Sequence, residues 1–176
     1  MSEAPESDAN EDIFRPDAAE FRKVLGQFAT GVTIITAVDG DEPTGVAANS
    51  FTSVSLDPPL VLFCVARTSS TWPRIERARK FAVNVLGEHQ EELSRLFATK
   101  GVDRFAQVDW HLGVGGSPVL HGCIAYLDCE FWAEYEGGDH IIVVGRVLDL
   151  GVEHDAGPLV FHQGQYGRFV VGEDTT

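Results

Sequence analysis

The sequence predicts a mainly β protein, an antiparallel barrel with a few peripheral helices. Three observations predict this fold class. Most of the chain divides into short segments rich in β-branched and aromatic residues. Clusters of Gly, Pro and Asp separate these segments, as turns do in antiparallel sheets. Only a few short stretches have helical spacing, and 176 residues with 44% hydrophobic content suit one closed barrel with a sizeable core.

The first expected element is a helix that follows Pro16. Asp17 and Glu20 have the spacing of a capping box. Apolar side chains then recur at i, i+3, i+4 and i+7 over residues 21–28, which is the spacing of one helix face. Gly31 ends this pattern.

Three strand-like segments come next. Residues 32–38 are rich in β-branched side chains, and Asp39-Gly40 favours a tight hairpin turn after them. Strand-like residues resume over 44–55 and over 60–66. Asp57-Pro58-Pro59 separates these two segments.

Two further helices enclose a short strand. The first is expected over 70–79, because Pro73 falls in its first turn. Residues 81–86 then predict a strand. The second helix is expected over 88–98, where the apolar residues of its inner face are Leu93, Leu96 and Phe97.

The last part of the chain returns to strands after a long loop. Residues 99–117 are expected to be mostly loop. Two long strands, 123–132 and 140–150, follow on either side of a Gly137-Gly138 turn. A last short strand is expected over 161–171.

Charge is the unusual part of the composition. The chain has 13 Lys and Arg against 27 Asp and Glu, which gives a net charge of −14. So acidic a surface repels nucleic-acid backbones and anionic membranes, and neither is an expected partner. Residues 1–12 and 173–176 hold seven of the acids and are expected to be tails around one domain over 13–172.

The sequence favours a cytoplasmic protein without a metal. No apolar run approaches the ~18 residues of a transmembrane helix, and residues 1–12 do not resemble a signal peptide. Cys64, Cys123 and Cys129 form no CxxC pair and are expected to be buried, reduced thiols. The six His residues include no HExxH or HxxxH pair.

Common motifs of nucleotide binding and hydrolysis are absent. The chain has no GxGxxG after a strand, no GxxxxGK[ST] and no GxSxG. A Rossmann site, a P-loop and a hydrolase elbow are therefore not indicated. Ser, His and Asp are all present, but no spacing arranges them as a triad.

Three segments are candidates for a binding site, each with a plainer interpretation beside it. The bases within residues 67–80 surround Ser69-Ser70-Thr71 ahead of a helix, which suits an anion site or an ordinary solvated helix face. The small residues of 44–53 let a flat ligand approach the backbone, or let a strand pack closely. His140 follows the Gly137-Gly138 turn, where it points into a cleft or lies on a hairpin surface.

Together these segments resemble the flavin reductase family, the small reductases of two-component monooxygenases. The specific part is Ser-Leu-Asp-Pro-Pro-Leu followed in order by Gly-Asp-His, and the resemblance covers about residues 17–169. The matching stretches are Phe21–Phe28, Thr30–Thr33, Gly45–Phe51, Ser53–Val61, Ser70–Trp72, Phe81–Leu86, Gly116–Pro118, Gly138–His140 and Pro158–Phe161, with Gly145, Gly164 and Tyr166.

The resemblance implies an FMN-binding split barrel, a Greek-key-like antiparallel β-barrel that forms a homodimer with the flavin near the subunit interface. It implies an NAD(P)H:flavin oxidoreductase. NADH or NADPH would reduce FMN or FAD, and a separate monooxygenase would use the reduced flavin. Hydride transfer between two cofactors requires neither a protein nucleophile nor a metal, which agrees with the missing motifs.

The resemblance also implies roles for individual residues. His140 would be the catalytic residue, orienting or polarising the nicotinamide. The residues implied in flavin binding are Pro43, Thr44, Gly45, Val46, Ala47, Asn49, Ser50, Cys64, Val65, Ala66, Ser70, Thr71, Leu96 and Phe97. Those implied on the nicotinamide side are His140, Phe161, His162, Gln163, Gly164 and Tyr166.

Other functions remain open at this stage. A split-barrel oxidase would hold FMN tightly and act on a substrate other than free flavin. A non-catalytic flavin-binding or sensor protein would bind flavin without oxidising NADH, and a small β-barrel can bind some other ligand. The choice of FMN or FAD, the choice of NADH or NADPH, and the partner oxygenase are not determined by the sequence.

Overall fold

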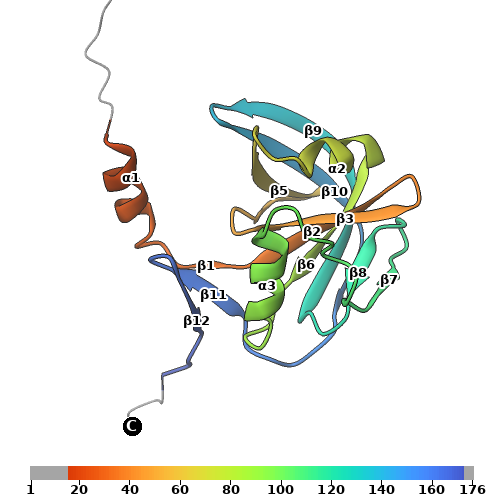
Figure 1. Cartoon of the computed structure of the whole chain (residues 1–176). Helices are drawn as coiled ribbons and strands as arrows, with labels where there is room; N and C mark the ends of the chain where they lie inside the picture. Colours follow the sequence, from red (N-terminus) through yellow and green to blue (C-terminus); the bar gives the residue numbers. More distant parts are fainter. Residues whose placement is uncertain (1–15, 173–176) are drawn as a thin grey trace, which may run out of the picture.

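One curled sheet dominates the computed structural model, which describes residues 16–172 (Figure 1). Its seven strands are antiparallel, in the order β3-β2-β6-β9-β10-β5-β4. The sheet curls until β3 contacts β5, which confirms the barrel expected from the sequence. The strands are β2 (Thr33–Asp39), β3 (Glu42–Ala48), β4 (Thr52–Leu56), β5 (Pro59–Ala66), β6 (Lys80–Val85), β9 (Ala125–Gly137) and β10 (His140–Val152).

Two small sheets and three helices surround this sheet. One small sheet joins β1 (Thr30–Gly31), β11 (Leu159–His162) and β12 (Gln165–Arg168), and the other joins β7 (Trp110–Leu112) to β8 (Pro118–Leu120). The helices are α1 (Ala18–Leu25), α2 (Trp72–Ala78) and α3 (Glu91–Ala98). No helix within residues 16–172 is long and apolar enough to cross a membrane.

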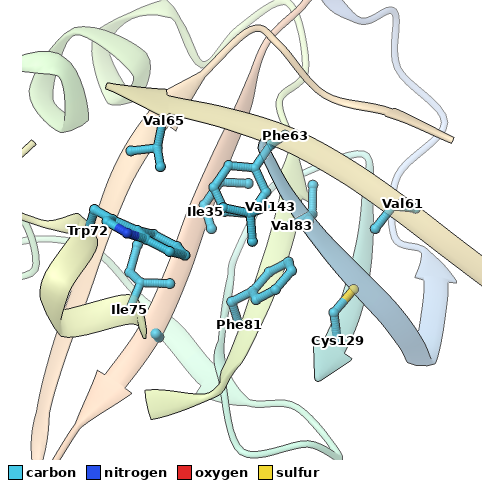
Figure 2. Packing of buried hydrophobic residues seen from close by; sticks show 11 residues of the cluster. Ile35, Val61, Phe63, Val65, Trp72, Ile75, Phe81, Val83, Cys129 and Val143 are labelled. Atoms are coloured by element: carbon cyan, nitrogen blue, oxygen red, sulfur yellow. The ribbon is translucent and has the colours of Figure 1, made fainter. Parts of the chain in front are cut away.

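The core consists of two apolar clusters. The first is drawn in Figure 2, where Phe63 of β5 packs between Trp72 of α2 and Phe81 of β6. The centroid of the Phe63 ring lies 6.2 Å from that of Trp72 and 5.3 Å from that of Phe81. Both pairs are edge to face, which is a favoured arrangement of aromatic rings. The second cluster contains Phe97, whose full burial holds α3 against β3.

Most of the expected strands and helices are confirmed, but two expected strands are interrupted. The segment 44–55 divides into β3 and β4 at Asn49-Ser50-Phe51, because the chain leaves the sheet edge there to reach the far end strand. The segment 161–171 turns at Gln163 and Gly164, whose φ angles are 50° and 77°, and so forms the β11–β12 hairpin. Positive φ is common for Gly but rare for Gln, so the turn at 163 had no strong sequence signal.

Smaller differences concern element ends. Helix α3 begins at Glu91 rather than near Glu88, and the short β7–β8 pair lies within and after the expected loop of 99–117. Asp17 accepts hydrogen bonds from the backbone N–H groups of Ala19 and Glu20, which confirms it as the cap of α1. The expected tails at 1–12 and 173–176 lie outside the described residues.

Candidate functional site

A cavity of about 610 Å³ lies where the two ends of the curled sheet meet, and we call it the main cavity. Residues 46–50 at the end of β3 form one wall, and residues 63–66 of β5 form another. Phe97 of α3 closes it from a third side, and the loop 68–71 and His140 complete it. Within residues 16–172, no three His, Cys, Asp or Glu side chains gather to hold a metal.

The backbone of β3 is open toward the main cavity because β3 is an end strand. A strand residue directs its N–H and C=O to the same side, and successive residues alternate. The carbonyl of Gly45 accepts from Arg104 on the open edge, so Ala47, two residues further, presents its N–H and C=O on that edge too. Gly45 itself has no room for a side chain, since a Cβ there would lie 2.8 Å from Phe97.

Ser50 fastens the chain between β3 and β4 to the opposite wall. Its hydroxyl accepts a hydrogen bond from the backbone N–H of Cys64 and donates one to the carbonyl of the same residue, both at 2.9 Å. These two bonds place Asn49 and Ser50 in the cavity wall beside β5. Burial raises the pKa of the Cys64 thiol, which also lines the cavity.

The hydroxyl run 69–71, one of the candidate binding segments of the sequence, lines one end of the main cavity. The Ser69 hydroxyl accepts hydrogen bonds from the backbone N–H groups of Thr71, at 3.3 Å, and of Trp72, the first residue of α2, at 3.2 Å. Thr71 is buried, while Ser70 is exposed. The run is therefore held in a fixed shape by the helix that follows it.

The cations at this end are Lys100 and Arg104, which the sequence analysis placed in a loop without a role. The Arg104 guanidinium donates to the Gly45 carbonyl at 2.7 Å, to the Thr71 hydroxyl at 3.0 Å and to the Thr99 carbonyl at 2.7 and 3.1 Å. Partial burial lowers the pKa of Arg104 from its usual value. No local pattern identifies either cation, because both reach the cavity through long-range packing.

The basic cluster of residues 67–80 does not supply the cations of the cavity, so the expectation that it surrounds the site is wrong. Arg67 pairs with Glu136 and also donates to the Gly138 carbonyl. Arg74 and Arg77 both bind Asp39, and the hydrogen bond from Arg77 lowers the pKa of that carboxyl. Arg79 lies over the ring of Phe131, 3.4 Å from its centroid. These cations instead bind carboxylates and an aromatic ring at the surface.

His140 occupies another part of the cavity wall. It pairs with Ala66 in the β10–β5 ladder, and its side chain is 45% exposed. Its Nδ1 lies 2.7 Å from the Asp139 carboxylate, and this hydrogen bond lowers the pKa of Asp139. An ionised Asp139 accepts a hydrogen bond from a protonated Nδ1, which leaves Nε2 for a ligand.

The end of the main cavity that is lined by Lys100 and Arg104 is separated along β3 from the end that is lined by His140. Gly45 binds Arg104, whereas Asn49 lines a second cavity together with His140. From Gly45 to Ala48, the last residue of β3, the strand spans about 10 Å, so the two ends are far enough apart for a long ligand. That second cavity, of about 830 Å³, lies between α1 and the 138–140 turn, and we call it the helix-side cavity.

The residues expected on the nicotinamide side divide into three groups. Phe161, Gln163 and Gly164 line the helix-side cavity with His140. Tyr166 faces α3 instead, where its hydroxyl lies 2.9 Å from that of Ser94 and its ring packs on Phe161. The exposed His162 is not among the residues that line the main or the helix-side cavity.

Ten of the residues expected to bind flavin line the main cavity, and four do not. Pro43, Thr44 and Gly45 line a cavity on the other side of Arg104, and Leu96 packs against the second core cluster. The lining residues are Val46, Ala47, Asn49, Ser50, Cys64, Val65, Ala66, Ser70, Thr71 and Phe97.

The comparison with protein families decides the family. Residues 25–169 match the model of the flavin reductase like domain. The chain belongs to this family. The match spans all the elements that wall the main cavity, from β3 to β10.

Relatives of known name agree with this membership. The chain is 47% identical over 150 residues to the reductase subunit HsaB of a flavin-dependent monooxygenase from Rhodococcus jostii, covering 85% of this chain and 77% of HsaB. It is 43% identical over 163 residues to the FMN reductase (NADH) SmoA of Agrobacterium fabrum, covering 91% and 92% of the two chains.

A solved structure of the flavin reductase family has the same fold. It is the NADH:FAD oxidoreductase SgcE6 of Streptomyces globisporus in complex with NAD and FAD fragments. The TM-score is 0.83 at 43% identity, and the alignment covers 91% of this chain and 96% of that one.

Proposed function

We propose that this chain is an NADH:flavin oxidoreductase that reduces FMN or FAD. The observation that carries the proposal is the main cavity, with two cations and a hydroxyl run at one end and a carboxylate-bound histidine at another. A flavin has a flat ring system at one end and a phosphate at the other. The donor set of the cavity fits that shape: hydroxyls and cations for phosphate, and open backbone groups for the ring edge.

The flavin would lie along β3. Its phosphate would meet Thr71, Lys100 and Arg104, and its ring would lie between the small residues of 46–50 and those of 64–66. The open N–H and C=O of Ala47 provide one donor and one acceptor for the polar edge of the ring. Phe97, which is fully buried, keeps this part of the wall rigid.

The nicotinamide would enter from the helix-side cavity. His140 borders both cavities, and Phe161 adds an aromatic wall beside it. The bound flavin supplies the hydride acceptor and NADH the hydride. The protein aligns the two rings and excludes competing reactions. His140, held through Nδ1 by Asp139, is the residue that orients the nicotinamide through Nε2.

Steady-state oxidation of NADH and of NADPH with FMN, FAD and riboflavin tests this function. We expect NADH to be oxidised with at least one flavin, and no oxidation with any flavin would refute the proposal. A protein that stays yellow through gel filtration and leaves free flavin unreduced would favour the tightly bound FMN oxidase. Flavin binding without NADH turnover would favour a sensor.

We also propose that a separate monooxygenase uses the reduced flavin. HsaB, a similar protein, is named as the reductase subunit of such an enzyme. The main cavity opens to solvent beside exposed residues such as Ser70 and Lys100, which suits a flavin that enters and leaves. Transfer of reduced flavin to an added flavin-dependent monooxygenase, measured as NADH-dependent product formation, tests this step.

A homodimer is the proposed assembly. Helix α1 projects from the body of the molecule and has no buried residue (Figure 1). Its apolar residues are largely exposed: Phe21 by 52%, Val24 by 63%, Leu25 by 55%, and Phe28 just after it by 76%. A contiguous exposed apolar face of this kind is typical of an interface. Sedimentation equilibrium tests the proposal, and a monomer at micromolar concentration would refute it.

The cytoplasm is the proposed location. Cys64, Cys123 and Cys129 are all free thiols, which suits a reducing compartment. NADH, the proposed reductant, is a cytoplasmic metabolite. Fractionation of cells that express the chain tests this proposal.

A further inference from the structure

Two histidine rings lie together on the small β7–β8 sheet, outside the main and helix-side cavities. The ring centroids of His111 and His121 are 5.2 Å apart, with an angle of 46° between the ring planes. Both residues are exposed. Within residues 16–172, the hydrogen bonds of both residues involve only their backbones, so the ring nitrogens are available to a ligand.

The backbone of this hairpin sets the distance between the two rings. His111 of β7 pairs with Val119 of β8, and His121 follows β8 directly. Because side chains alternate along a strand, the residue two positions beyond Val119 lies on the same face as His111 and diagonally opposite it. The N–H of His121 donates to the Asp109 carbonyl at 3.0 Å, so the pairing continues past the histidine. The two rings are therefore brought together before any ligand binds.

The separation of the rings is that of two imidazoles on one metal ion. Zn²⁺ binds an imidazole nitrogen at about 2.0–2.1 Å, and the ring centroid lies about 1.1 Å beyond that nitrogen, so each centroid would lie about 3.2 Å from the ion. Two such ligands at a tetrahedral angle of about 109° have centroids about 5.2 Å apart, and at a right angle the centroids are about 4.5 Å apart. The observed 5.2 Å matches the tetrahedral arrangement.

Charge and ligand type both favour a transition-metal ion at this pair. The net charge of −14 attracts cations to the protein surface. Imidazole nitrogen is a ligand of Zn²⁺, Cu²⁺ and Ni²⁺, whereas Mg²⁺ and Ca²⁺ prefer oxygen. Among the described residues, no group of three His, Cys, Asp or Glu forms here, so water would complete the coordination.

We propose that His111 and His121 together bind a divalent transition-metal ion of the zinc type. The site lies apart from the proposed flavin chemistry and does not depend on it. Its expected effect is structural, because β7 and β8 form a sheet of only two strands, which is marginally stable by itself. An ion across the pair would fasten β7, and with it the end of the loop that carries Lys100 and Arg104.

Isothermal titration calorimetry of the full chain with Zn²⁺, without flavin, tests the proposal. We expect the wild type to bind Zn²⁺ with a Kd below about 0.1 mM, and His111→Ala and His121→Ala each to raise that Kd by about tenfold or more. The double variant should be no weaker than either single variant, because one ligand alone does not hold the ion. His162→Ala is the matched control, since His162 is an exposed histidine on β11, in a different sheet.

Three results would overturn the proposal. They are a wild-type Kd above about 0.1 mM, equal Zn²⁺ affinity in the wild type and both alanine variants, and a loss of binding confined to His162→Ala. Both histidines are exposed, so the metal-free variants should melt within about 2 °C of the wild type. Saturating Zn²⁺ should raise the Tm of the wild type and of His162→Ala but not that of the other two variants.

Electron paramagnetic resonance with Cu²⁺ provides a measurement that requires no variant. Bound to the wild type in equimolar amount, Cu²⁺ should show splitting from two imidazole nitrogens, the ligands that the pair provides. A spectrum of oxygen ligands alone would overturn the proposal even if the alanine variants failed to fold.

Discussion

Replacing Arg104 by Gln tests where the flavin phosphate lies. The guanidinium Nη1 of Arg104 is 3.0 Å from the Thr71 hydroxyl, which also lines the phosphate end of the main cavity. A phosphate oxygen bonded to that hydroxyl would lie about 2.7 Å from it and therefore within about 6 Å of Nη1. The substitution removes a full positive charge from this position.

The magnitude follows from that distance. Two unit charges about 6 Å apart, in an effective dielectric constant of about 20, interact by about 2.8 kcal/mol. Arg104 is partly exposed, so screening reduces this to roughly 1.4 kcal/mol, or about tenfold in Kd. A phosphate monoester with a charge near −2 makes the effect larger, so the Kd of FMN should rise by about 10- to 100-fold.

Riboflavin provides the comparison, because it lacks only the phosphate. Isothermal titration calorimetry should show the Kd of riboflavin changed by less than about threefold in Arg104→Gln. Lys100→Gln, which removes a second cation without breaking the bonds of Arg104 to Gly45 and Thr99, should weaken FMN in the same direction. Arg95→Gln is the charge-matched control, since Arg95 pairs with Glu91 on the surface of α3.

Two results would refute this reasoning. Equal weakening of FMN and riboflavin would mean that Arg104 supports the cavity only by tying its loop to β3. Unchanged FMN affinity in both Arg104→Gln and Lys100→Gln would place the phosphate elsewhere.

Three further predictions concern other parts of the molecule. His140→Ala should lower kcat/KM for NADH by at least about tenfold while changing the Kd of FMN by less than about threefold, and equal loss of both would argue against a nicotinamide role. Burial raises the pKa of Asp128 above its value in the unfolded chain, so the native state binds the proton more tightly than the unfolded state does. The wild type should therefore gain stability relative to Asp128→Asn as the pH falls from neutral toward 4. A difference in Tm between the two proteins that stays constant over this pH range would contradict the prediction. Burial raises the pKa values of Cys123 and Cys129 to about 12, so only Cys64 should react with a thiol reagent in the folded protein, and saturating FMN should slow that reaction. Rapid labelling of all three thiols would show that the core opens.

The Asp128 prediction depends on how tightly its loop is packed. The Asp128 carboxylate accepts a hydrogen bond of 2.5 Å from the backbone N–H of Gly115. A Cβ on Gly113 or Gly115 would lie within 2.6 Å of that carboxylate, so the loop approaches closely only because both residues are glycines. Burial with few partners disfavours the charged form.

Local patterns were sufficient for the mainly β fold and for much of the candidate site. Residues 32–38 and 60–66 form strands because β-branched and apolar side chains suit a pleated, buried surface. The small residues of 46–50 line the main cavity, as expected of a segment that lets a ligand approach the backbone. His140 stands at the turn between β9 and β10, which the Gly137-Gly138 pair predicted. These features depend on neighbours within a few residues, which a sequence displays directly.

The tertiary structure alone decided which charges face the cavity. Five bases near Ser69-Ser70-Thr71 made residues 67–80 the apparent anion site, but Asp39 and Glu136, distant in sequence, pair with three of them. The cations that line the cavity are instead Lys100 and Arg104, from a loop with no recognisable motif. They lie beside the hydroxyl run because α3, which precedes this loop, packs on β3. The sequence by itself determined the strands, the small-residue wall and the histidine turn. The partners of each charge depend on contacts between distant segments, and only the folded chain brings those segments together.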